Sequence, residues 1–236
     1  MIRPEPDTPL TVCENQATLA IVDAALMNLW NVANELARIR PPGDRYRVTL
    51  FGSSRATPGD PAYDTTRRFA EAMARDGCDI VTGGGPGLME AANEGARRGD
   101  PEDHTRSVGI RVDLPFEQHA NPHVEQLFVH QTFFSRLHHF IRLSNAYVVV
   151  EGGIGTTLEM VVVWQLLQVD HLDGIPLVAV GPMWRELVDW ARRHMTEGRL
   201  QLASPADMDL VHCVDTVDDA IEVIRTHRRT WRERLA

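Results

Sequence analysis

A glycine-rich stretch at residues 151–159, EGGIGTTLE, carries the residue types that bind an anion without a metal. Glycines leave main-chain N–H groups accessible, and a threonine adds a hydroxyl near the start of the helix that follows. Glu159 lies one helical turn beyond that threonine, on the same face of the helix. We therefore expect a phosphate-type anion beside the carboxylate. The predicted anion-binding residues are Gly152, Gly153, Gly155 and Thr156.

A structural role is the alternative for Glu159. A glutamate three residues after a threonine N-cap can close a capping box, in which both side chains bond the main chain of the first helical turn. Three glycines are unnecessary for such a cap, so the composition of residues 151–159 favours ligand binding.

Arg136 falls near the start of a predicted helix at 132–143. A helix of about 12 residues spans roughly 18 Å, and a strand of about six spans roughly 20 Å. The chain therefore returns to the level of the carboxyl end of the strand at 146–150. We expect Arg136 and Glu159 to meet at one cleft; a surface arginine without a role is the alternative.

Two further strand ends are rich in glycine and hydroxyl groups: FGSSR at 51–55 and TGGGPGLME at 82–90. Glycine permits close approach of a ligand to the backbone, and the helix after the second loop offers its positive end to an anion. The spacing is not GxGxxG, so the dinucleotide fingerprint does not apply. We expect Ser53, Gly84 and Gly85 to line the remaining wall of the site, with ordinary turns as the alternative.

Strand and helix patterns alternate from residue 45 onward. Apolar runs separated by helical periodicity predict an α/β, Rossmann-like doubly wound fold, with a mainly parallel sheet and helices on both faces. In such sheets ligands bind at the carboxyl ends of strands, near a switch in strand order. The predicted strands are 46–51, 79–82, 107–112, 146–150, 176–180 and 208–214, the helices 62–76, 87–98, 132–143, 156–169, 183–196 and 216–234, and the long loops 99–106 and 115–123.

An amphipathic pattern precedes this domain. Between residues 15 and 40, apolar side chains recur every three or four residues until Pro41 and Pro42 end the pattern. We predict an N-terminal helical extension over 1–44 and a Rossmann-like domain over 45–236. This extension and the apolar helix around Val161 and Leu167 offer more apolar surface than one sheet face requires, which predicts a homodimer or a higher homo-oligomer.

Composition excludes several functions. All 24 basic residues are arginine, so the chain cannot form a pyridoxal phosphate Schiff base or a P-loop of the GxxxxGK[ST] type. The net charge of −9 argues against nucleic acid as a partner. No apolar run approaches the roughly 18 residues of a membrane span, and no secretion signal begins the sequence. We therefore expect a cytoplasmic protein that does not bind a membrane.

Three motifs together resemble a known family: GGGPGLMEAAN at 83–93, an arginine sixteen residues before Gly152, and GGxGTxxE at 152–159. They resemble the LONELY GUY (LOG) family, often labelled lysine decarboxylase-like, over residues 45 to about 225. The stretch LPFEQ at 114–118 resembles its bacterial variant. The resemblance implies a Rossmann-like dimer that hydrolyses nucleoside 5′-monophosphates, such as AMP or cytokinin ribotides, to free base and ribose 5-phosphate. It also implies catalytic roles for Arg136 and Glu159.

The implied reaction passes through an oxocarbenium-like state, which a carboxylate facing the sugar stabilises. Glu159 is the candidate for this role and for orienting water, and Arg136 would hold the ribose or phosphate and keep Glu159 ionised. No metal or organic cofactor is required. The sequence does not determine which base is preferred.

Two positions depart from the family pattern. Glu151 stands where the family has proline, and Leu137 stands where a lysine usually follows the arginine. A carboxylate beside a phosphate loop repels the ligand, and the missing lysine removes a positive charge. These departures favour the alternative of a non-catalytic binding protein, similar to molybdenum-cofactor carriers, that holds a phosphorylated, nucleotide-like ligand.

Overall fold

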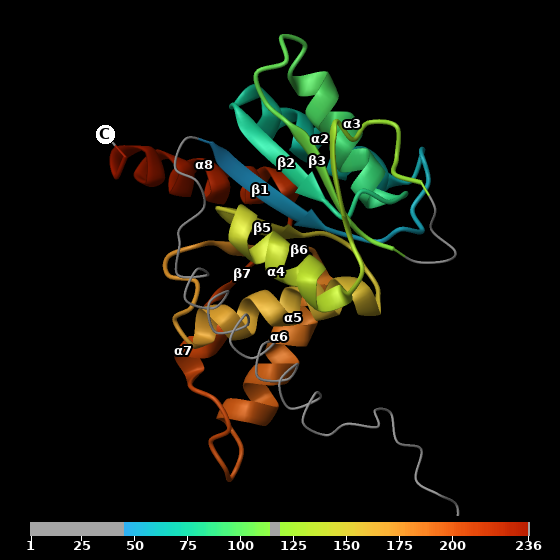
Figure 1. The fold of residues 1–236 in the computed structure, drawn as a ribbon. Helices are drawn as coiled ribbons and strands as arrows, with labels where there is room; N and C mark the ends of the chain where they lie inside the picture. Colours follow the sequence, from blue (N-terminus) through green and yellow to red (C-terminus); the bar gives the residue numbers. More distant parts are fainter. Residues whose placement is uncertain (1–44, 114–118, 236) are drawn as a thin grey trace, which may run out of the picture. The chain divides into compact units, whose positions relative to one another are not determined.

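A computed structural model describes residues 45–113 and 119–235. The predicted extension at 1–44 and the LPFEQ stretch at 114–118 lie outside the described residues. The strands are β1 (Tyr46–Phe51), β2 (Cys78–Thr82), β3 (Ser107–Val112), β4 (Gln126–His130), β5 (Ala146–Val149), β6 (Leu177–Val180) and β7 (Val211–Val214) (Figure 1). The helices are α2 (Pro61–Arg75), α3 (Leu88–Gly99), α4 (Phe133–Leu143), α5 (Ile154–Gln168), α6 (Pro182–Ala191), α7 (Pro205–Met208) and α8 (Val217–Glu233).

The strands form one parallel sheet in the order β4-β3-β2-β1-β5-β6-β7. The chain winds outward from β1 to β4, and β5 then returns to the other side of β1. The switch in strand order therefore lies between β1 and β5, where an open α/β sheet places its ligand site. The predicted doubly wound α/β fold is confirmed.

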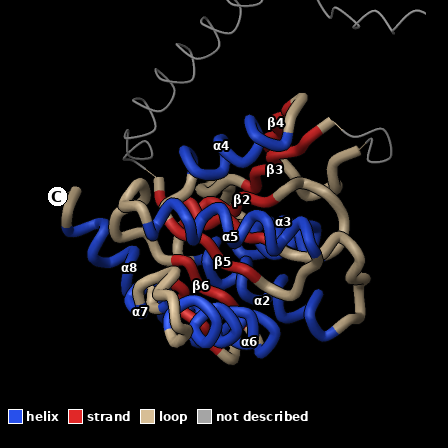
Figure 2. The backbone as a smooth tube through the Cα atoms, turned by 90° about the horizontal axis from the view of Figure 1, so that it is seen from below, coloured by secondary structure: helices blue, strands red, loops and turns tan. Residues whose placement is uncertain are grey.

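Both faces of the sheet are buried, which explains the near-continuous apolar strands. Val48 and Leu50 belong to one core cluster, which includes residues of α2, α3 and α8. Tyr147 and Val149 belong to the other, which includes residues of α4, α5 and α6. Helices accordingly lie on both sides of the sheet (Figure 2). Because α4 and α5 pack on the same face, residues near their first turns can meet.

The structure differs from the predicted elements in three places. Strand β4 was not among the predicted strands, because its apolar run is only three residues long and its side chains are exposed or half-buried at the sheet edge. The strand predicted to begin at Met208 begins at Val211 instead. Residues Pro205–Met208 form α7, in which Ser204 and Asp207 make a capping box.

The last part of the predicted helix at 183–196 also differs. Helix α6 ends at Ala191, and Arg192–Thr196 form a π-helical turn. Within residues 45–113 and 119–235, no helix is long and apolar enough to cross a membrane.

Candidate active site

The loops after β1 and β5 are joined by main-chain hydrogen bonds at the switch point. Val150 N donates to Phe51 O at 3.0 Å, and Ser53 N donates to Glu151 O at 2.9 Å. On the other side, the buried indole Nε1 of Trp184 on α6 donates to Val150 O at 3.2 Å. The glycine turn that follows Glu151 therefore leaves the sheet from a fixed position.

The turn at 152–156 offers an open helix end. Gly153 is the N-cap of α5, no side chain caps this end, and the first turn contains no acidic residue. A Cβ at Gly153 or Gly155 would meet no atom within 4 Å, whereas a Cβ at Gly152 would collide with Thr156. Unbonded N–H groups and the helix dipole favour an anion at such an end.

The start of α5 rules out the capping alternative for Glu159. The helix begins at Ile154, two residues before the expected start at Thr156, because a glycine takes the N-cap position. Thr156 is thus the third residue of the helix and is 5% exposed, and Glu159 is the sixth. A capping box requires the acidic residue at the third position, so Glu159 is not part of one.

Arg136 and Glu159 form an ion pair between α4 and α5. The Nη2 group of Arg136 donates to Oε1 of Glu159. The Arg136 side chain is 16% exposed and that of Glu159 10%. Thr132 caps α4 by accepting from Ser135 N at 3.1 Å, which fixes the helix start one turn before Arg136. The predicted meeting of the two residues is confirmed, and Arg136 is not a surface arginine.

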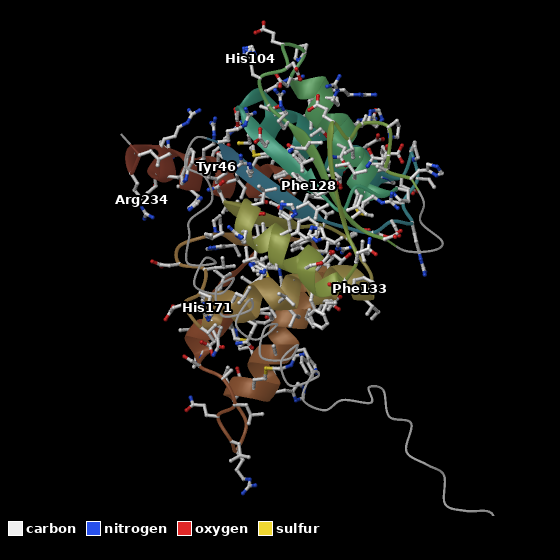
Figure 3. All side chains as sticks on the ribbon, viewed as in Figure 1. Tyr46, His104, Phe128, Phe133, His171 and Arg234 are labelled. Atoms are coloured by element: carbon white, nitrogen blue, oxygen red, sulfur yellow. The ribbon has the colours of Figure 1, made fainter. Side chains whose placement is uncertain are left out.

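Aromatic rings surround the guanidinium of Arg136. Its Cζ lies 5.8 Å from the ring centroid of Phe133 and 5.6 Å from that of Phe140. Phe133 lies at the start of α4 (Figure 3). The Nε atom is buried and has no acceptor among the described residues. The ion pair with Glu159 therefore leaves this buried N–H group unsatisfied among the described residues.

Burial raises the pKa of the Glu159 carboxyl, and the neighbouring Arg136 lowers it only part of the way back. Desolvation by burial therefore has a larger effect on this pKa than the ion pair with Arg136 does. A carboxylate in such an environment interacts strongly with positive charge that develops beside it.

The chain matches the protein family described as "Possible lysine decarboxylase" over residues 89–224, more than half of its length. It belongs to this family, the LOG family. Curated relatives include the pyrimidine/purine nucleotide 5′-monophosphate nucleosidase of Escherichia coli K12, which is 26% identical over 174 residues. That match covers 71% of the LOG-family chain and 37% of the relative, so the chain spans well under half of the length of the curated relatives it matches.

Solved structures similar to this LOG-family protein show the same fold. The molybdenum cofactor carrier protein of Chlamydomonas reinhardtii has a TM-score of 0.58 and 18% identity, and the match covers 78% of this chain and 99% of that one. The molybdenum cofactor binding protein of Rippkaea orientalis has a TM-score of 0.59 and 17% identity, and the match covers 78% of this chain and 98% of that one.

The second glycine loop of the LOG-family protein is less open to an anion than the first. Leu88 N, at the start of α3, already donates to Ser53 O at 2.8 Å. Glu90 adds a negative charge in the first turn of α3, where the helix dipole favours anions. Of these two helix ends, the start of α5 is therefore more open to an anion than the start of α3. Ser53 itself is half-buried, and its Oγ accepts from Arg55 N at 3.1 Å.

Gly84 and Gly85 are buried, and their carbonyl groups accept hydrogen bonds from Asn121, the first from its main-chain N and the second from its side chain. Sequence reasoning missed Asn121, because it lies in a predicted loop and bonds residues more than 30 positions away. The roles of Ser53, Gly84 and Gly85 as ligand-lining residues remain predictions.

The two departures from the family pattern differ in their setting. Glu151 is exposed, and its main-chain carbonyl holds Ser53 as described. Leu137 is half-buried on α4, next to Arg136. An exposed carboxylate is screened by water and salt, which limits its repulsion of a phosphate.

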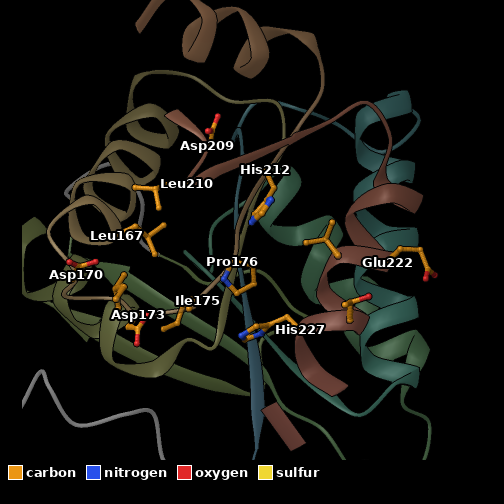
Figure 4. Close-up of a pocket in the computed structure, with 14 residues that line it drawn as sticks. Leu167, Asp170, Asp173, Ile175, Pro176, Asp209, Leu210, His212, Glu222 and His227 are labelled. Atoms are coloured by element: carbon orange, nitrogen blue, oxygen red, sulfur yellow. The ribbon is translucent and has the colours of Figure 1, made fainter. Parts of the chain in front are cut away.

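A separate hollow of about 630 Å³ lies at the amino-terminal edge of the sheet, at the opposite ends of the strands (Figure 4). Residues that line it include Pro176 before β6, His212 on β7, and Glu222 and His227 on α8. None of its lining residues belongs to the glycine loops or to the Arg136–Glu159 pair.

Proposed function

We propose that this LOG-family protein hydrolyses the N-glycosidic bond of a nucleoside 5′-monophosphate to free base and ribose 5-phosphate. The observation that carries the proposal is the ion pair between Arg136 on α4 and the buried Glu159 on α5, the helix whose open first turn suits a phosphate. Gly153 and Glu159 are separated by about 9 Å along the helix axis. A nucleotide phosphate at the glycines would leave its sugar within reach of the carboxylate. The E. coli relative's name supports the same substrate class.

In the proposed reaction, the bond between C1′ and the base nitrogen breaks as water adds to C1′. One water proton leaves with the base, and the other stays on the new hydroxyl group. Glu159 stabilises the positive charge that develops on the ribose and orients the water. Arg136 holds Glu159 in place, and its guanidinium donates to a ribose or phosphate oxygen. The chain has no lysine, so a pyridoxal-dependent lysine decarboxylase is not proposed despite the family description.

Incubation with a panel of nucleoside 5′-monophosphates, followed by chromatography of the products, tests the proposal. We expect free base and ribose 5-phosphate from at least one member, AMP and cytokinin ribotides included. The matched nucleosides, which lack the phosphate, should react far more slowly because the open turn of α5 then has no anion to bind. Absence of free base from every monophosphate would contradict the proposal.

A binding protein without turnover is the second candidate, favoured by Glu151 and Leu137, which make the site less positive than the family pattern. The molybdenum cofactor proteins have the same fold at under 20% identity, so the likeness extends to architecture alone. Calorimetry that detects AMP binding, together with no release of base, would favour this candidate over hydrolysis.

Replacing Glu151 by proline restores the family residue and should leave base release unchanged or raise it by up to about tenfold, because a negative charge near the phosphate is removed. The Glu151 carbonyl that accepts from Ser53 N is retained in the variant. Glu151→Gln is the matched control, since it removes the charge without changing the backbone. A large loss of activity in both variants would show that the carboxylate contributes to the reaction.

We also propose that the protein is a homodimer or a higher homo-oligomer. On α5, Ile154, Leu158 and Val161 form a stripe that is 88%, 48% and 43% exposed, and Phe134 on α4 is 76% exposed. Exposed apolar side chains at this spacing are typical of a helix that packs on a partner. Light scattering should give at least twice the 26.5 kDa chain mass at micromolar concentration. A mass of one chain would contradict the proposal.

A further inference from the structure

Asn121 joins the connection between β3 and β4 to the glycine loop after β2. Its side chain is buried, and its Nδ2 donates to Gly85 O at 2.9 Å and to Asn93 Oδ1 at 3.0 Å. Its main-chain N donates to Gly84 O at 2.9 Å. Its Oδ1 accepts from His123 N at 3.1 Å. One residue thus bonds two consecutive carbonyl groups of the loop.

Asn93 on α3 continues the network beneath the loop and is fully buried. Its Nδ2 donates to Ser107 Oγ on β3 at 2.9 Å. Its Oδ1 also accepts from Thr82 Oγ1 at 2.7 Å, and Thr82 Oγ1 in turn accepts from Gly84 N at 2.9 Å. The N–H and C=O groups of Gly84 are therefore both bonded through this network.

Close packing leaves the loop little freedom beneath these bonds. Gly84 has a φ of +71°, and a Cβ there would lie 3.1 Å from the Cα of Gly109 on β3. A Cβ at Gly87 would collide with the main chain of Ser53 and Ser54. The loop lies directly on the neighbouring backbone on both sides. Asn121 supplies the hydrogen bonds that hold it there.

We infer that Asn121 is a positioning residue for the nucleotide site: it fixes residues 83–87 as one wall of the site but does not touch the reacting atoms. The inference rests on the proposed function. Arg136 and Glu159 belong to α4 and α5, which pack on the other face of the sheet, so the ion pair does not depend on Asn121. Loss of the wall should therefore weaken substrate binding and leave the chemical step nearly unchanged.

Asn121→Ala tests this inference, with Asn145→Ala as the matched control. Asn145 is also buried, and its Oδ1 accepts from Arg47 N at 2.9 Å at the amino-terminal end of β5, far along the sheet from the glycine loops. Both variants remove a buried amide, so both should lower the melting temperature. Only Asn121→Ala should raise the KM for the monophosphate, by about tenfold, with kcat within about twofold of wild type.

Hydrogen exchange gives a readout that does not need substrate. The amides of the four glycines at 83, 84, 85 and 87 should exchange faster in Asn121→Ala than in Asn145→Ala, because the loop has lost its side-chain donor. A KM equal in the two variants, or equal loop exchange, would overturn the inference and leave Asn121 with a purely structural role.

The wild-type measurements separate this inference from the proposed function. If wild type binds AMP but releases no base, hydrolysis fails as a proposal. The dissociation constant for AMP is then measured in place of KM. A value about tenfold higher in Asn121→Ala than in Asn145→Ala would support the positioning role of Asn121, and equal values would overturn it. If wild type binds no monophosphate at all, both proposals are overturned together.

Discussion

Glu159→Gln should lower the turnover number for base release by about 10²-fold or more, with little change in affinity for the monophosphate. Glutamine keeps the size of the side chain and can still accept a hydrogen bond from Arg136, but it lacks the negative charge. The negative charge stabilises the ribose most strongly when the ribose becomes positive in the transition state. Removal of this charge should therefore lower kcat. The turn of α5 that is proposed to bind the phosphate is unchanged by the substitution, so binding should persist.

Base release from AMP and equilibrium binding of AMP, measured on the same preparations, check this result. Glu151→Gln is the matched control, because it makes the same chemical change eight residues earlier at an exposed position. Its turnover should stay equal to that of wild type or rise. If Glu159→Gln releases base as fast as wild type does, the catalytic assignment of Glu159 is wrong.

Arg136→Ala should lower kcat/KM by about 10³-fold, because it removes both a ligand contact and the partner of a buried carboxylate. Arg136→Lys should lie between this variant and wild type, since it keeps the charge but loses the forked guanidinium geometry. Circular dichroism should accompany these measurements, because loss of one partner of a buried pair also destabilises the fold. A kcat/KM equal to that of wild type would show that Arg136 does not act in the reaction.

Arg136→Ala should also change the pH dependence of kcat/KM. In the proposed reaction the ionised form of Glu159 is the active one, so activity should fall as pH falls through its pKa. Burial raises this pKa, and Arg136 partly lowers it. Without Arg136 the pKa rises further, so the acidic limb of kcat/KM should move to higher pH than in wild type. An acidic limb at the wild-type position would contradict the coupling between these two residues.

Six of the seven strands and the meeting of Arg136 with Glu159 followed from the sequence, because both depend on regular patterns. Strands buried on two faces are apolar along their whole length, and a helix and a strand of known rise bring the chain back to the same edge of the sheet. Strand β4 was missed because its apolar run is only three residues long, and Leu127 and Val129 remain exposed at the sheet edge.

Other features depend on contacts that sequence spacing does not encode. Asn121 and Asn93 are 28 positions apart, and only the fold brings their side chains together. The start of α5 at Ile154 depends on a glycine N-cap, although a nearby threonine is the commoner signal for this position. The pKa of Glu159 reflects the depth of its burial, which no local pattern specifies.

Gly153 and Gly155 affect how this sequence can change over generations. At positions 52 and 152 an added methyl group would clash with neighbouring side chains, so folding alone keeps these glycines. At positions 153 and 155 an added methyl group would meet no atom within 4 Å. Helix formation would favour serine or aspartate at the N-cap position 153 and alanine at position 155. If the loop no longer bound a ligand, substitutions of these two glycines would be tolerated by the fold. Glycine at both is what continued selection for a ligand would maintain.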